Sequence, residues 1–277
     1  MASMKKCLQL AGLIAALILM TACDQEKADW HKAVETDTPE AYRTFIAKYP
    51  EGFRTQMAAY HLERMIYKNA LRLKTVAAYQ DYLREFPKGR WAANARNQIN
   101  SITQFQIRRT PDEKVAAARI KFSTDYGDFT IRVFPEKAPV TSRNLIGLVA
   151  TGFYDGLVFF HAIPGELVQT GDPRGDGLGG PGYFIPFEET GLKHLRGAVS
   201  MYRSPVDPNT AGSQFVICLK DLPQRDGKFV VFGEVVEGLE TVERISQLNI
   251  TGEGEERSVT VSPARVKHAV VEGIEIK

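Results

Sequence analysis

The sequence is poor in the residues that form disulfides and metal centres. Only three of its 277 residues are cysteines, and both Cys7 and Cys23 lie close to the N-terminus. Cys218 alone remains in the folded body, so an intramolecular disulfide is excluded there. Its apolar surroundings predict a buried thiol rather than a nucleophile. The five histidines lack the spacing of metal ligands, so we expect no metal site. They are His31, His61, His161, His194 and His268.

The sequence also lacks an excess of charge of either sign. It contains 35 Lys and Arg against 33 Asp and Glu, which leaves a formal net charge of +2. Proteins that bind nucleic acid usually carry a clear basic excess, so we expect no nucleic-acid partner. The apolar fraction of 44% is ordinary and allows at least one substantial core.

Long apolar runs are scarce, and the one at the N-terminus has the features of an export signal. Lys5 and Lys6 precede an almost unbroken apolar run from Leu8 to Met20. The run of about 13 residues is shorter than the roughly 20 that a membrane-spanning helix needs. This favours a cleaved signal peptide over residues 1–22 and an exported protein.

The end of this run, Met20-Thr21-Ala22-Cys23, resembles the lipobox of bacterial lipoproteins, with Met20 where Leu is usual. The resemblance implies lipidation of Cys23 and an anchor in a membrane. Asp24 resembles the retention signal of enterobacterial inner-membrane lipoproteins, so we expect the periplasmic face of the inner membrane. The alternative is an ordinary signal peptide cut near Ala22, which would release a soluble protein.

Residues 23–108 have a helical pattern with an internal repeat. The segment from Thr38 to Gly52 recurs about 37 residues later, from Thr75 to Gly89. In each copy a mostly aromatic stripe follows helical spacing, and Pro-x-Gly then ends the helix. The stripes are Tyr42, Phe45, Ile46 and Tyr49 in the first copy and Tyr79, Tyr82, Leu83 and Phe86 in the second.

Helical hairpins at this period resemble tetratricopeptide-like repeats, although the Trp-Leu-Gly signature of those repeats is missing. We interpret the stripes as the core between the helices of a small all-α domain. A groove that binds a protein partner is the alternative interpretation.

A polar stretch at residues 109–118 is the predicted linker, and beyond it the hydrophobic period changes to two. Apolar and polar residues alternate on both sides of a turn at residues 125–128, which predicts a β-hairpin. Short apolar runs between glycines and prolines continue to the C-terminus, with helices predicted at Pro139–Ala150 and Leu239–Leu248. We therefore expect a mainly β domain over residues 119–277.

Six motifs in this domain resemble, in their order, those of bacterial cyclophilins. They are APVTSRNL (138–145), GFYDGL (152–157), IPGELVQTGDP (163–173), GGPGY (179–183), GSQF (212–215) and FVVFG (229–233). The resemblance implies a closed antiparallel eight-stranded barrel with two capping helices. It also implies peptidyl-prolyl cis-trans isomerase activity, which needs no cofactor. The glycines at residues 175–180 are interpreted as turn positions of a β-loop, not as a phosphate loop.

Cyclophilins catalyse rotation about the peptide bond before proline, whose barrier is about 18–20 kcal/mol. An arginine guanidinium favours the twisted state by donating to the proline nitrogen. The family's arginine lies three residues before Pro-Gly, and this chain has His161 there, with Phe160 at the family's histidine. A slip of one residue would put Ala162 at the arginine position instead. Either alignment removes the guanidinium.

The resemblance implies catalytic positions at His161 and Gln169. The substrate-binding positions that it implies are Phe159, Phe160, Glu166, Leu167, Tyr202, Arg203, Gln214, Val216, Arg225 and Phe229.

Several of these positions depart from the family pattern. Glu166 and Val216 replace two phenylalanines of the proline pocket, Arg225 replaces a leucine and Phe229 a histidine. The pocket is therefore expected to be smaller and more polar, whereas the glutamines that hold the substrate backbone are kept. Arg203, on a loop that lines the family's groove, is the alternative source of a guanidinium.

The sequence thus predicts an exported, lipid-anchored cyclophilin-type isomerase of weak or restricted activity, which binds proline-containing polypeptides. The alternative is a catalytically inactive cyclophilin-like lipoprotein that binds peptides or acts as a scaffold. In both cases the helical repeats are a candidate surface for a protein partner.

Overall fold

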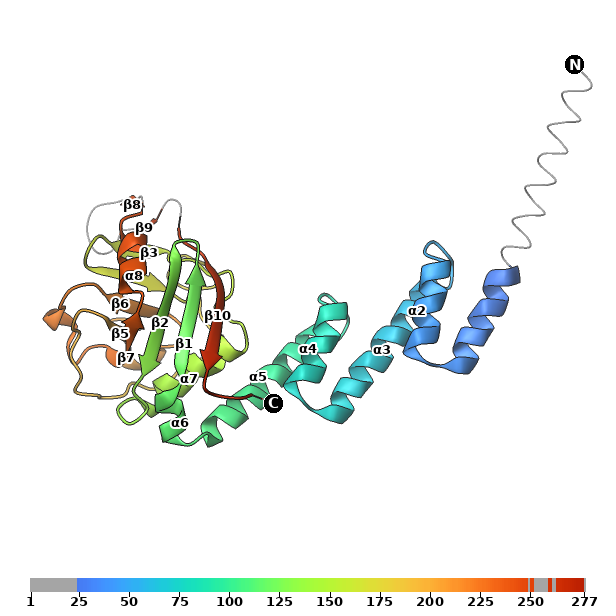
Figure 1. Ribbon diagram of the computed structural model, residues 1–277, viewed down its shortest axis with the longest axis horizontal. Coiled ribbons are helices and arrows are strands. Elements are labelled where there is room, and N and C mark those ends of the chain that lie inside the picture. The colour runs from blue at the N-terminus through green and yellow to red at the C-terminus, as the bar shows by residue number, and fades with distance from the viewer. Residues whose placement is uncertain (1–23, 249, 252–258, 261–262, 277) are drawn as a thin grey trace, which may run out of the picture. The chain divides into compact units, whose positions relative to one another are not determined.

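The computed structural model describes residues 24–248, 250–251, 259–260 and 263–276. It divides between Ile99 and Asn100 into two compact units (Figure 1). Unit 1 is helical, and unit 2 contains the strands. The predicted signal peptide and Cys23 lie outside the described residues. Within the described part of the chain, no helix combines the length and the apolar character that crossing a membrane requires.

Unit 1 consists of helices joined by short turns. A helix over residues 24–36 is followed by α2 (Pro39–Lys48), α3 (Thr55–Leu73), α4 (Val76–Glu85) and the first part of α5 (Ala92–Arg109).

The two copies of the sequence repeat begin and end their first helices in the same way. Thr38 and Thr75 are the N-caps of α2 and α4, and each side chain accepts a 3.2 Å hydrogen bond from the backbone N–H three residues on. The backbone N–H groups of Gly52 and Gly89 each donate to the carbonyl three residues back, at 3.1 Å. The sequence repeat is therefore also a structural repeat.

The aromatic stripes form the interior of unit 1. Tyr42 and Phe45 in the first copy and Tyr79 and Tyr82 in the second are at most 3% exposed. The interpretation of these side chains as core is confirmed. The likeness to tetratricopeptide repeats stays a prediction.

The segment predicted as a linker, residues 109–118, is largely helical. Most of it forms α6 (Asp112–Ala117), and Val115 and Ala118 are fully buried. Both join Ile107 of α5 in the core of unit 2. Only the exposed side of α6 is polar, so the polar residues that suggested a linker lie on a helix surface. The division between the units accordingly falls before this stretch and not within it.

Unit 2 is an antiparallel barrel of eight main strands (Figure 1). These are β1 (Arg119–Thr124), β2 (Gly127–Val133), β3 (His161–Ile163), β4 (Leu167–Thr170), β5 (Ala198–Met201), β6 (Phe215–Cys218), β7 (Val230–Glu237) and β10 (Val266–Glu272). Their order in the sheet is β10-β1-β2-β7-β5-β6-β4-β3, and the short strands β8 (Ile250–Thr251) and β9 (Val259–Thr260) continue it beyond β3.

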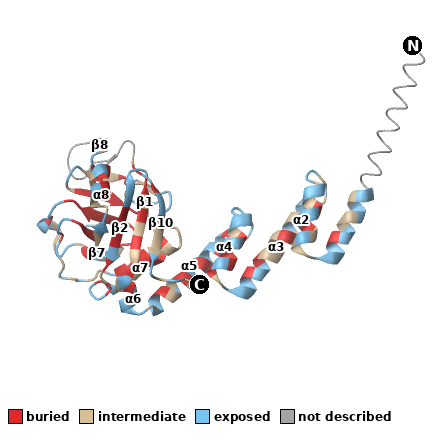
Figure 2. Ribbon diagram, in the orientation of Figure 1, coloured by how far each residue is buried: buried red, intermediate tan, exposed pale blue. Residues whose placement is uncertain are grey.

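The barrel closes through backbone hydrogen bonds between segments far apart in the sequence. Residues 156–159, just before β3, bond to residues 264–266, which lead into β10. The predicted eight-stranded antiparallel barrel is confirmed. Side chains of alternate residues fill its interior, where buried positions line the strands (Figure 2).

Two helices pack on the barrel. Helix α7 (Pro139–Ala150) contacts β7 and β10, and α8 (Leu239–Ser246) contacts β2, β3 and β4. Helix α7 has the predicted bounds, and α8 ends two residues before its predicted end. The Glu188 carboxylate holds the N-terminus of α7, because it accepts hydrogen bonds from the backbone N–H groups of Val140 and Thr141 at 2.9 and 2.8 Å.

Candidate functional site

The candidate catalytic residue lies on the outer face of a short β-hairpin. His161 of β3 pairs with Gln169 of β4, and the turn between the strands is closed by the Glu166 N–H, which donates to Ile163 O at 2.9 Å. Ala162 is buried in the barrel interior, so His161 points to the opposite, outer face. The alignment without a slip fits this geometry, because position 162 offers no side chain to the outer face.

Strand pairing extends this outer face across the sheet. Gln169 pairs with Val216 of β6, Val216 with Ser200 of β5, and Ser200 with Val231 of β7. Paired residues in antiparallel strands place their side chains on the same side. His161 and the four residues beyond it therefore form one row of side chains along the outside of the barrel.

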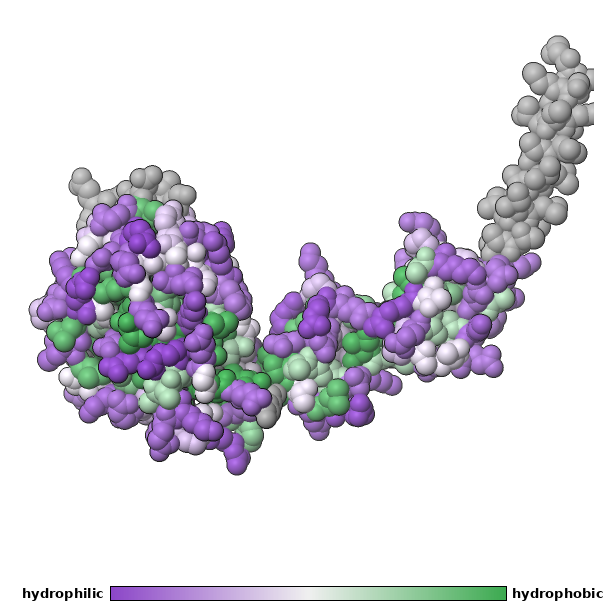
Figure 3. All heavy atoms as spheres, in the orientation of Figure 1, coloured by the Kyte–Doolittle hydropathy of each residue, from purple (hydrophilic) through white to green (hydrophobic). Residues whose placement is uncertain are grey.

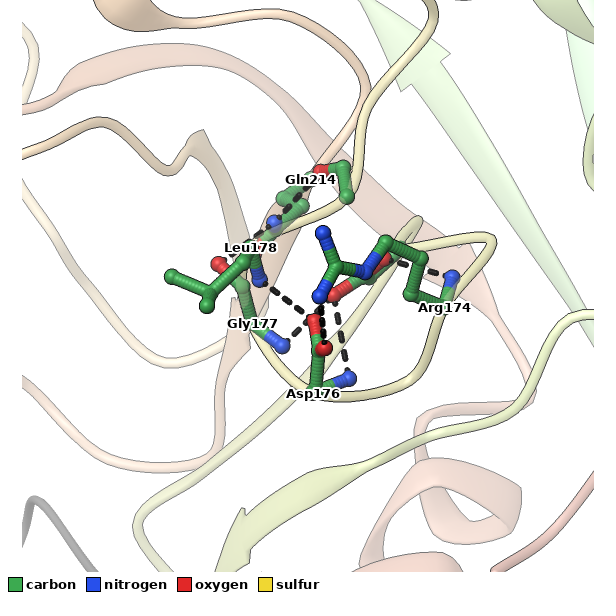
Figure 4. A network of polar contacts seen from close by, with 7 residues as sticks. Arg174, Asp176, Gly177, Leu178 and Gln214 are labelled. Atoms are coloured by element: carbon green, nitrogen blue, oxygen red, sulfur yellow. Dashed lines mark hydrogen bonds and ion pairs between the residues drawn. The ribbon is translucent and has the colours of Figure 1, made fainter.

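The two retained glutamines are joined by a hydrogen bond. Gln169 Nε2 donates to Gln214 Oε1 at 2.8 Å, and both side chains are buried. Gln214 Nε2 in turn donates to the carbonyl oxygens of Gly177 and Gly179, at 3.0 and 2.8 Å (Figure 4). Gln214 thus fastens the glycine-rich loop to the residue before β6, and Gln169 Oε1 is an acceptor atom of the kind that a peptide N–H can use.

A buried carboxylate holds the same loop from its other side. Asp172 is 1% exposed and accepts hydrogen bonds from the backbone N–H groups of Arg174 at 2.7 Å and Gly177 at 2.5 Å. Asp176 accepts from the backbone N–H of Leu178 at 2.9 Å and pairs with the Arg174 guanidinium at 2.6 Å (Figure 4). Gly175 and Gly177 have positive φ angles, as expected of glycines that form turns.

This loop forms one wall of a groove with a cavity volume of about 400 Å³. The facing residues are Tyr202, Arg203, Ser204, Pro205, Thr210, Gly212, Ser213 and Gln214. Of the predicted substrate-binding residues, three line this groove: Tyr202, Arg203 and Gln214. The glycine-rich loop was not among the predicted binding residues, although its unusual glycine content is a signal that could have indicated a wall of the groove.

Exposed apolar side chains surround the groove. Leu178 and Phe184 line it and are 79% and 70% exposed, and Val206 nearby is 92% exposed. Apolar side chains also reach the surface of both units more generally (Figure 3). A cluster of exposed apolar groups beside a groove is typical of a surface that binds another polypeptide.

An apolar cluster lies on the outer face next to Gln169. Leu167 and Val216 are buried there together with Cys218, Leu222 and Val231. The predicted pocket positions Leu167 and Val216 are thus brought together. The prediction that Cys218 is a buried thiol is confirmed, and burial raises the pKa of this thiol to about 12.

Phe229 is surrounded by polar and cationic groups. Its ring stacks on Tyr202, with 6.1 Å between ring centres. The guanidinium carbons of Arg225 and Arg203 lie 4.2 and 5.3 Å from the centre of the Phe229 ring. The aliphatic side of the family's proline pocket is therefore replaced here by guanidinium groups.

The Arg203 guanidinium donates hydrogen bonds to nearby backbone carbonyl oxygens. Its Nε donates to Lys228 O at 2.8 Å, and its Nη1 donates to Ser204 O at 2.7 Å. The guanidinium is therefore fixed between two loops, and these bonds hold two of its nitrogen atoms away from a substrate.

The remaining predicted residues lie in different surroundings. Phe159 is fully buried in the barrel interior against Phe129, so its predicted contact with substrate is wrong. Phe160 is 8% exposed, and its ring lies behind Gly177 of the glycine loop. Glu166 is ion-paired with Lys220. A carboxylate thus stands at the edge of the pocket where the family has an aromatic ring.

Comparisons with known proteins agree with this geometry. A family model described as cyclophilin type peptidyl-prolyl cis-trans isomerase matches residues 119–271. The peptidyl-prolyl cis-trans isomerase-like 3 of Mus musculus is 43% identical over 136 residues, which cover 47% of this chain and 83% of that protein. A peptidyl-prolyl cis-trans isomerase of Helicobacter pylori is 38% identical over 156 residues, covering 55% of this chain and 93% of that protein.

The barrel also resembles a solved structure. A cyclophilin type peptidyl-prolyl cis-trans isomerase of Cryptosporidium parvum, determined in the presence of the dipeptide Ala-Pro, is 32% identical. The TM-score is 0.50, and the match covers 56% of this chain and 98% of that one. On the motifs, the barrel and these matches, the chain belongs to the cyclophilin-type peptidyl-prolyl cis-trans isomerase family.

Proposed function

We propose that this protein isomerises peptidyl-prolyl bonds of exported polypeptides at a rate far below that of an ordinary cyclophilin. The observation that carries the reduced rate is the position of His161. It stands beside Gln169 on the outer face of the barrel, where the family resemblance places an arginine.

The expected reduction follows from the chemistry of the side chain. A guanidinium stays charged and presents several N–H donors in one plane, whereas a neutral imidazole offers one donor. If the missing contact stabilises the twisted amide as other charge-assisted hydrogen bonds do, its loss raises the barrier by about 2–4 kcal/mol. The rate then falls roughly 30-fold to 1000-fold.

Substrate binding is expected to survive better than turnover. Gln169 and Gln214 keep their places, and the groove beside them has apolar residues at its rim. The related Cryptosporidium structure was determined with the dipeptide Ala-Pro. We therefore propose proline-containing polypeptides as the ligands of the groove.

A second candidate function is peptide binding without catalysis. It is favoured by the polar groups around the proline pocket, namely the Glu166–Lys220 ion pair and the Arg225 guanidinium on the Phe229 ring. Such groups oppose burial of a proline ring, because they require solvation that the ring displaces. In this case the barrel would serve as a scaffold, and the helical unit would recruit a protein partner.

An isomerisation assay with a His161→Arg variant tests the first proposal. The full chain should turn over a standard proline peptide slowly, and the variant should be at least about tenfold faster because the guanidinium is restored. His268→Arg is the matched control, since it makes the same change on β10 at a side chain that is 61% exposed. If the unmodified chain already matches ordinary cyclophilins, another group supplies the contact and the proposal is wrong. If both proteins are inactive, the binding function is favoured.

We further propose export and lipid anchoring through Cys23, on the periplasmic face of the inner membrane. The support is the order of Lys5 and Lys6, the apolar run, and Met20-Thr21-Ala22-Cys23. Fatty-acid labelling of expressing cells should mark the unmodified chain and not a Cys23→Ser variant. Label on the variant would contradict the anchor, and fractionation with the outer membrane would contradict the location.

A further inference from the structure

A second cavity lies in unit 2 between helices α5 and α6 and helix α7. Its volume is about 600 Å³, which is within the range of ligand-binding cavities. Gln104, Arg108 and Asp112 form the wall on the α5 and α6 side. These three residues precede the family match, which begins at residue 119. The cavity is therefore built partly by a segment outside the matched family domain.

Two arginines give the cavity a positive character. Arg143 of α7 is 16% exposed, and its Nη2 lies 2.7 Å from both Thr110 O and the Asp112 carboxylate. Both contacts use Nη2, so Nε and Nη1 carry three further N–H donors. Arg108 is exposed on α5, and its charge reaches the Tyr183 hydroxyl, where it lowers a pKa that burial raises. The lining residues carry two guanidiniums and one carboxylate, and the nearby Glu188 carboxylate is bound to the backbone N–H groups of Val140 and Thr141. The lining therefore favours an anionic ligand, and carboxylates match the geometry of guanidiniums.

The rest of the lining is apolar. Pro139, Val140 and Ile185 form it, and Val140 is 41% exposed. A ligand that fits both parts carries a carboxylate next to an apolar side chain. Acidic residues flanked by apolar ones in a polypeptide have this chemistry, and arginine clusters commonly recognise such segments.

The cavity shares a wall with the groove. Tyr183 and Ile185 line the cavity, whereas Pro181 and Phe184 of the same segment line the groove. The Tyr183 hydroxyl donates to Asn144 Oδ1 at 2.7 Å. Asn144 is buried and donates through Nδ2 to the carbonyl oxygen of Gly212 at 2.6 Å. Gly212 lines the groove two residues before Gln214.

We propose that this cavity binds an acidic polypeptide segment and is coupled through Asn144 to the groove. The binding part stands on the cavity alone, and the coupling part rests on the proposed function of the groove as a peptide-binding site. With this coupling, a segment bound in the cavity changes the affinity of the groove for a proline peptide. Coupling is reciprocal, so a proline peptide in the groove changes the affinity of the cavity by the same factor.

Calorimetric titration of the full chain tests the binding part. The probe is acetyl-Glu-Leu-Glu-Leu-amide, which contains no proline, and acetyl-Gln-Leu-Gln-Leu-amide is its uncharged match. The acidic peptide should bind, and Arg108→Gln should weaken it roughly tenfold through the loss of a charge-assisted contact. Arg109→Gln is the matched control, because Arg109 is the next residue, lies over the Phe105 ring and is not part of the cavity lining.

Three results would overturn the binding part. The uncharged peptide binds as well as the acidic one, both arginine variants weaken binding equally, or the acidic peptide does not bind at millimolar concentration. Equal binding by octanoate would replace the polypeptide with a small acid and overturn the proposed occupant.

The coupling part is tested by measuring the affinity for a proline peptide with and without saturating acidic peptide. We expect a change of at least about threefold, lost in Tyr183→Phe because this variant lacks the hydroxyl that donates to Asn144. An unchanged affinity in the unmodified chain would overturn the coupling. The readout is binding and not turnover, so a slow or inactive isomerase leaves it valid. A chain that binds the acidic peptide and no proline peptide would contradict the proposed groove function and the coupling, but not the cavity site.

Discussion

Arg225 places its guanidinium 4.2 Å from the centre of the Phe229 ring, at a position where the family resemblance places a leucine. The outer face of the barrel therefore has a cation where an apolar surface would normally receive the proline ring. This limits what His161→Arg alone can restore, because the variant returns the guanidinium at the twisted amide and leaves the pocket polar. We therefore expect binding and turnover to depend on different residues of this site.

The buried His194, paired with the half-buried Asp226 next to Phe229, makes the stability of the protein depend on pH. The His194 side chain is fully buried, and its Nδ1 lies 3.0 Å from Asp226 Oδ1. Burial lowers the pKa of His194 and outweighs the hydrogen bond to Asp226, which raises it, while the charge of Arg225 also lowers it. The unfolded chain takes up a proton at His194 near its ordinary pKa of about 6.5, whereas the folded chain does so only at lower pH. Acidification through this range therefore favours the unfolded state.

We expect the free energy of unfolding of the full chain to fall between pH 7 and pH 5, with His194 contributing at most about 1.4 kcal/mol per pH unit. His194→Gln should reduce this slope, which urea unfolding at several pH values would measure. Leu195→Gln, an exposed neighbour, should keep the slope of the unmodified chain. An identical slope in all three proteins would show that His194 does not contribute.

Single residues of the site were predictable from the sequence only where a motif fixed their place. Pro164-Gly165 located His161 and Gln169, and the structure pairs them. Phe159 was misassigned because its side chain is buried in the barrel interior, and the motif does not say which way the two phenylalanines before β3 point. The partners of Gln214 come from a loop more than 30 residues away, so no local pattern indicates them.

Among the features of the secondary structure, the ends of helices were the easiest to predict from the sequence. The threonines at 38 and 75 and the bounds of α7 were predictable, because capping residues and proline act locally. Helix α6 was not predictable, since its six residues depend on burying Val115 against the barrel. The contact between the Glu188 carboxylate and α7 was not predictable either, because Glu188 lies 47 residues from Thr141 in the sequence.

Removing this carboxylate should destabilise the barrel. Glu188 accepts hydrogen bonds from two backbone N–H groups of α7 and from the Thr141 hydroxyl at 2.6 Å. We expect Glu188→Ala to lower the free energy of unfolding by about 1–3 kcal/mol, since charged acceptors at a helix N-terminus are stabilising. Chemical denaturation would measure the change. The exposed neighbour supplies the comparison, and Glu189→Ala should cost less than about 0.5 kcal/mol. Equal losses would exclude a capping role.

For the whole molecule, the position of the boundary decides which fragment is stable. Ile107 and Val115 are fully buried in the barrel core, although both precede the family match. We expect a fragment of residues 100–277 to exceed one of residues 119–277 in free energy of unfolding by roughly 3–6 kcal/mol, from the burial of these two side chains. Far-UV circular dichroism in urea would follow both fragments.

The same comparison has an internal control. Phe105 is on the same helix and 59% exposed, so Phe105→Ala in the longer fragment should change little. Two fragments of equal stability would mean that α5 and α6 add nothing to the barrel and that the domain begins where the family match begins.

The matching caps of α2 and α4 affect how the number of hairpins in unit 1 can change. Because Thr38 and Thr75 begin equivalent helices, the junction before Thr75 offers the same chemistry as the one before Thr38. A tandem duplication of residues 38–74 would therefore insert a complete hairpin with its own start and stop signals, and no cap elsewhere in the chain would be cut. We therefore expect a duplication of this length to be tolerated, so that unit 1 could gain or lose a hairpin while the barrel sequence stays unchanged.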